Sequence, residues 1–97
     1  MVIGVGRVVL RLHDSHSLKD KRRVLKPVIA QVQRQFQLAV AEVDSQDEWQ
    51  IGVLGLACVS NSAAHADQII AKAVGFIERQ HIDAEMLEYQ TEIIHAL

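Results

Sequence analysis

The sequence predicts a single α+β domain, in which a four-stranded antiparallel sheet carries two helices on one face. Two observations support this fold class. Four segments have the composition of strands, most of them with alternating apolar side chains, and two others repeat apolar residues at the helical period of 3.6. These segments follow one another as strand, helix, strand, strand, helix, strand. Because the chain has 97 residues, one domain covering residues 1–97 accounts for its length.

The first predicted strand covers residues 2–12, whose side chains alternate between two kinds. One side has no polar atoms and is expected to face the core, where Gly4 and Gly6 would let a helix come close. The other side places Arg7 and Arg11 among apolar residues, as on a sheet face that is open to water or to a partner.

The first predicted helix covers residues 18–35, and Ser17 with Asp20 forms a capping pair at its start. Its apolar sector consists of Leu18, Leu25, Val28, Ile29, Val32 and Phe36. Pro27 interrupts the hydrogen bonding of this helix, so we expect a kink that frees the Arg23 carbonyl. A break, with Pro27 as the first residue of a new helix, is the less favoured alternative because the apolar sector continues through it.

The rest of the chain supplies the other four elements. A second strand near residues 36–44, whose buried side the pattern does not fix, is joined to a third over 49–60 by the polar residues 44–48. The third strand is apolar on both faces and is expected at the centre of the sheet. A second helix runs to about residue 80, and an amphipathic strand covers 85–94. This order is the split βαβ pattern of ferredoxin-like folds, which leaves one sheet face uncovered.

Positive charge is concentrated near the start of the chain, although the formal net charge is −2. Residues 1–34 hold eight of the ten basic residues and two acids, whereas residues 35–97 hold two basic residues and ten acids. Such an asymmetry indicates an anionic partner or head-to-tail self-association. Five cations with few compensating acids lie on the first helix, and phosphate groups suit them as partners. They are Lys19, Lys21, Arg22, Arg23 and Lys26.

Two interpretations of these cations remain open. They bind an anionic partner, or they form only a solvated helix face, which is the common alternative for a run of charges. Lys21 projects near the apolar sector and would have to extend past its edge to reach water. On the uncovered sheet face, Arg7 and Arg11 are expected to form a second anion-binding patch. Both patches would contact phosphates without reading sequence, because no arrangement of side chains suited to base edges is visible. The uncovered side of the first strand also has no aromatic residue on which bases could stack.

The sequence contains no motif that indicates an enzyme, a metal site or a cofactor. His13 and His16 form an H-x-x-H pair, but no second close pair or cysteine cluster completes a metal site. The sequence GVGR at 4–7 is followed by more strand instead of a helix, which argues against a dinucleotide-binding loop. Its position within a strand also differs from that of the glycine-rich loop of acylphosphatases. The single cysteine, Cys58, lies in an apolar run and is expected in the core.

The hydropathy pattern favours a cytoplasmic protein that does not enter the membrane. The longest apolar runs are far shorter than the roughly 20 residues that span a bilayer. The first twelve residues do not have the order of features found in signal peptides. One cysteine cannot form an intramolecular disulfide, which is consistent with a reducing compartment.

Three stretches resemble the YlxP-like family of small bacterial proteins, whose function is largely unassigned. They are SLKDKRRVLKP at 17–27, AEVDSQDEWQ at 41–50 and LGLACVSNSAAHAD at 54–67. The resemblance extends over nearly the whole chain, and the S-L-K-[DE]-K-R-R helix start is its most specific part. It implies a ferredoxin-like fold and, from the genes that usually accompany the family, a role around the small ribosomal subunit. It implies no catalytic residues.

The leading hypothesis is therefore a non-enzymatic binding module that contacts ribosomal RNA, or a ribosome assembly or translation factor, through its basic first helix. The alternative is a homo-oligomeric structural or small-ligand-sensing domain that uses the open sheet face. In that case the acidic last strand, with Glu88 and Glu92, would lie against the basic half of a neighbouring copy. A hydrolase with a histidine and an acid is a third, less favoured hypothesis.

Overall fold

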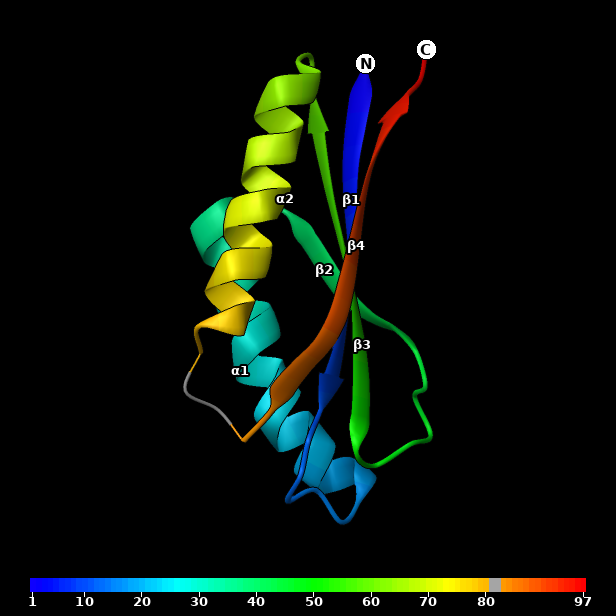
Figure 1. Cartoon of the computed structure of the whole chain (residues 1–97), viewed down its shortest axis with the longest axis vertical. Coiled ribbons are helices and arrows are strands. Elements are labelled where there is room, and N and C mark those ends of the chain that lie inside the picture. The colour runs from blue at the N-terminus through cyan, green and yellow to red at the C-terminus, as the bar shows by residue number, and fades with distance from the viewer. Residues whose placement is uncertain (81–82) are drawn as a thin grey trace.

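The computed structural model describes residues 1–80 and 83–97, and Figure 1 shows a sheet with both helices on the same side. The elements are β1 (Val2–Arg11), α1 (Leu18–Phe36), β2 (Ala39–Asp44), β3 (Ile51–Ser60), α2 (Ala63–Glu78) and β4 (Glu85–His95). The strands lie in the order β2-β3-β1-β4, and each neighbouring pair is antiparallel. This arrangement confirms the predicted ferredoxin-like βαββαβ fold.

The hydrophobic core lies between the helices and one face of the sheet. Inward and outward residues alternate along β1, with Val8 and Leu10 buried on the helix side. Gly4 lies on the same side, and a Cβ atom there would be only 3.1 Å from an Ile70 side-chain carbon and 3.2 Å from Ala66 Cβ, both on α2. The prediction that glycine in β1 permits close helix packing is therefore confirmed. Cys58 is buried in this core, as expected.

Helix α1 is capped at both ends and continues through its proline. Ser17 Oγ accepts a hydrogen bond of 3.0 Å from the Asp20 backbone N–H, and Gln37 ends the helix in the left-handed conformation at φ 53°. The predicted alternative of a break at Pro27 is wrong, because one helix spans Leu18–Phe36. Pro27 lies on the exposed side, where water can replace the missing donor to the Arg23 carbonyl.

The two edge strands, β2 and β4, differ in length. β2 has 6 residues, whereas β4 has 11 and exposes most of its side chains. Helix α2 begins after its cap residue Ser62, and its buried residues are Ala66, Ile70, Ala73, Val74 and Ile77. Neither α1 nor α2 is long and apolar enough to cross a membrane. The sheet face away from the helices is left without cover by the described residues (Figure 1).

Candidate functional site

The structure separates the predicted anion-binding residues into three places. Lys19, Arg22, Arg23 and Lys26 are exposed on α1, Lys21 is buried beneath it, and Arg7 and Arg11 lie on the open sheet face. The two patches are on opposite sides of the sheet. A single contact surface therefore cannot use all of the predicted cations at once.

The first place is the outward side of α1, which we call the basic face. Its members are Lys19, Arg22, Arg23, Lys26 and Arg34. Arg34 shares this side of the helical wheel, although the predicted site does not include it. Fifteen residues separate Lys19 from Arg34, which corresponds to about 22 Å along the helix. The charges thus form a stripe instead of a point.

Acids do little to neutralise the basic face. Arg23 Nη1 lies 4.0 Å from Asp20 Oδ1, and both side chains are solvent-exposed, so this pair is weak. Within residues 1–80 and 83–97, no carboxylate lies within 4.0 Å of the charged groups of Lys19, Arg22 or Lys26. The exposed cations of the basic face therefore repel one another across adjacent turns unless an external anion approaches.

Lys21 is a correction to the predicted site. Its side chain is 1% exposed, and it points into the protein instead of extending past the edge of the apolar sector. The ammonium donates hydrogen bonds to the backbone carbonyls of Ser45 (2.9 Å), Gln46 (3.2 Å) and Ile51 (3.1 Å). These three bonds use all three of its N–H donors. A buried ammonium with its donors occupied cannot contact an RNA phosphate.

Glu42 supplies the charge that makes the burial of Lys21 tolerable. Glu42 Oε2 lies 2.7 Å from Lys21 Nζ, closer than any of the three carbonyl oxygens. The carboxylate therefore acts as a close counter-charge. On the period of two, Glu42 shares a side with the buried residues Leu38 and Val40. An inward acid in β2 and an inward lysine in α1 were the sequence signals for this pair.

Arg7 lies among carboxylates, which weakens the case for Arg7 and Arg11 as a phosphate-binding patch. Arg7 Nη2 lies 3.4 Å from Asp44 Oδ2, and Arg7 Nη1 lies 3.9 Å from Glu88 Oε1. Arg11 is exposed at the end of β1, opposite Glu85 of β4 in the strand register. Acids from both sheet edges thus offset Arg7, whereas Arg11 has an acid opposite it in the register but no ion pair within the described residues.

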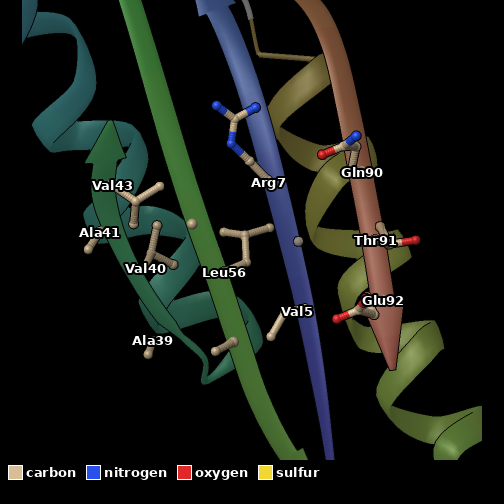
Figure 2. A pocket seen from close by; sticks show the side chains of 13 residues that line it. Val5, Arg7, Ala39, Val40, Ala41, Val43, Leu56, Gln90, Thr91 and Glu92 are labelled. Atoms are coloured by element: carbon tan, nitrogen blue, oxygen red, sulfur yellow. The ribbon is translucent and has the colours of Figure 1, made fainter. Parts of the chain in front are cut away.

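The open sheet face contains a shallow hollow that sequence reasoning missed. It has a volume of about 880 Å³ and spans all four strands, from Val43 on β2 to Glu92 on β4 (Figure 2). Gly55 forms part of its floor. Val43 packs closely over this glycine, since a Cβ atom there would lie 2.7 Å from Val43 Cγ1. Three alanines, Ala39, Ala41 and Ala57, also line the hollow. Their shared side of β2 and β3 was the available signal.

The described residues do not bring together the groups of a recognisable metal site. No cluster of three or more His, Cys, Asp or Glu suited to a metal ion occurs within 1–80 and 83–97. His13 Nε2 lies 3.9 Å from Glu85 Oε1, but both side chains are exposed at the end of the sheet. His81 lies outside the described residues.

Comparisons with known proteins agree on family and fold. The family model described as "Protein of unknown function (DUF503)" matches residues 3–91. The chain is 34% identical over 77 residues to the uncharacterized protein YlxP of Bacillus subtilis (strain 168), covering 79% of this chain and 84% of that protein.

Two solved structures, both de novo designs, share the fold. One is LFR1 1, a designed protein with a ferredoxin fold, which has a TM-score of 0.55 and 14% identity over 100% of this chain and 88% of its own. The other is Foldit4, with a TM-score of 0.54 and 10% identity over 100% of both chains. At these identities the likeness concerns the fold alone. The family match and the curated relative show that the chain belongs to the YlxP-like family, DUF503, whose function is unknown.

Proposed function

We propose that the protein is a non-enzymatic RNA-binding module, with ribosomal RNA as its partner and the basic face of α1 as its contact surface. The observation that carries this proposal is the row of exposed cations on α1, of which only Arg23 has a carboxylate nearby among the described residues. A phosphate backbone offers anions in a row, which suits cations spread over about 22 Å of helix. A partner of this kind places the protein in the cytoplasm.

Recognition through this surface depends on charge and shape. Lysine and arginine side chains on an exposed helix neutralise phosphates and release counterions, which gives affinity without sequence preference. Lys21 takes no part, and the flanking carboxylates make Arg7 a poor phosphate ligand. The proposal therefore rests on fewer cations than the sequence indicated.

The test is the salt dependence of binding to a fluorescein-labelled fragment of small-subunit ribosomal RNA, measured by fluorescence polarisation. The helix variant replaces Lys19, Arg22 and Lys26 with glutamine. We expect the slope of log K against log salt to fall by about 0.7–0.9 for each phosphate that the variant no longer neutralises. A control with the same change of charge replaces the exposed Arg11, Lys72 and Arg79 with glutamine.

The control separates a local surface from a general charge effect. We expect the control variant to keep a slope close to that of the wild type. Equal flattening in both variants would show that only net charge matters and would remove α1 as the binding surface. Failure of the wild type to bind the RNA at low salt would refute the proposed function itself.

A further inference from the structure

We propose that the open sheet face is a self-association surface, on which a second copy of this chain packs to form a symmetric dimer with its helices on the outside. The surface lies on the side of the sheet away from the helices (Figure 1). It is separate from the basic face of α1. This inference goes beyond the proposed function and does not depend on RNA binding.

Apolar side chains lie side by side at one end of the open face. In the strand register Ile3 is opposite Val59 of β3 and Ile94 of β4, so the three form a row across the sheet. Val59 is 69% exposed and Ile94 is 40% exposed. A contiguous apolar row of this kind on a sheet face is typical of an interaction surface.

The shape of the open face suits packing against a second sheet. The row of larger side chains lies beside the hollow of about 880 Å³, whose lining includes Gly55 and three alanines. Val43, which is 51% exposed, forms one wall of the hollow. Two sheets that pack face to face interdigitate large side chains with small ones, and a second copy brings the same combination.

The charges on the open face are self-complementary. Arg7 lies between Asp44 and Glu88, so this region carries both signs. In a two-fold interface the same patch of each copy faces the other. Arg7 of one copy can therefore lie near Asp44 or Glu88 of the other copy. The carboxylates of Asp44, Glu88 and Glu92 oppose an RNA backbone here, which favours a second copy over nucleic acid.

The size of the face matches that of a stable interface. Strands of 10, 6, 10 and 11 residues, at about 3.3 Å per residue and about 4.8 Å apart, give about 600 Å² in plan. Side chains add relief to this area, which brings it close to the roughly 800 Å² that each partner contributes to a standard interface. Burial of the whole face is needed to reach that size, so the dimer must pack face to face.

The test is sedimentation velocity of the 97-residue chain over a series of concentrations, without RNA. We expect the wild type to move from the monomer mass of 10.8 kDa towards twice that value. Val59→Asp, on β3, and Ile94→Asp, on β4, should each raise the dissociation constant at least about 100-fold, because each buries a charge in the interface. Both positions are exposed, and circular dichroism melting checks that each variant folds.

Tyr89→Asp is the matched control. Tyr89 is 57% exposed on β4, but its register opposite Val8 places it on the helix side of the sheet. We expect this variant to dimerise within a few fold of the wild type. A wild type that stays monomeric at every concentration would overturn the proposal. So would a Tyr89→Asp variant that dissociates as readily as Val59→Asp, since that result would point to pairing along the β4 edge.

Discussion

At the scale of single residues, Lys21 and Arg22 show what the sequence can and cannot predict. They are adjacent and equally charged, yet one is buried and the other exposed. The helical wheel places Lys21 near the apolar sector, so its inward direction was partly predictable. Its hydrogen-bond acceptors lie 24 to 30 residues further along the chain, where a local pattern carries no information. Lys21 was wrongly assigned to the anion-binding site because the local pattern does not contain these distant partners.

Replacing Lys21 should therefore lower the stability of the fold, because Lys21 itself makes no contact with RNA. In Lys21→Met three backbone carbonyls lose their donor and Glu42 loses its counter-charge. Breaking a buried pair in this way should lower the free energy of unfolding by about 3–5 kcal/mol. Urea denaturation measures this value. Arg22→Met, the same change at the exposed neighbour, should shift it by no more than about 0.5 kcal/mol. A decrease below about 1 kcal/mol in Lys21→Met would mean that water replaces the ammonium.

At the scale of elements, the helices were predicted more closely than the edges of the sheet. Period and capping residues located α1 within one residue of its observed end. The second strand was predicted from residue 36, but Phe36 still belongs to α1 and β2 begins at Ala39. A bulge in β2 then lets Val43 and Asp44 both contact groups on the open face. A bulge breaks the period of two, so alternation would place Asp44 on the helix side, and its position beside Arg7 could not be read from the sequence.

Pro27 offers a direct test of the energetics of α1. Pro27→Ala restores a backbone N–H that can donate to the Arg23 carbonyl, and the position is exposed. We expect the free energy of unfolding to rise by about 1–3 kcal/mol. Gln31→Ala, one turn later on the exposed side, is the control and should change stability by only a few tenths of a kcal/mol. A less stable Pro27→Ala variant would indicate that α1 must bend at this point to pack on the sheet.

At the scale of the whole molecule, the charge asymmetry of the sequence becomes a separation in space. The basic face belongs to the helix layer, whereas Glu88 and Glu92 belong to the opposite side of the sheet. The sequence shows the asymmetry along the chain but not where the two signs of charge lie in space, because a fold can interleave its two halves. With this topology, a dimer formed through the open faces would carry its two basic faces outward. Self-association and RNA binding would then be compatible.

This arrangement predicts avidity for long RNA, and the prediction rests on both proposals. Two basic faces on one dimer convert the second contact with a long RNA into an intramolecular one. We expect the wild type to bind a long ribosomal RNA fragment at least about tenfold more tightly than Val59→Asp, at concentrations where the wild type is dimeric. A short RNA hairpin that reaches one face only should bind both proteins equally. Fluorescence polarisation with the two probes measures this difference, and Tyr89→Asp should follow the wild type. Equal affinity of wild type and Val59→Asp for the long RNA would mean that the two basic faces do not act together, because dissociation of the dimer leaves each basic face unchanged.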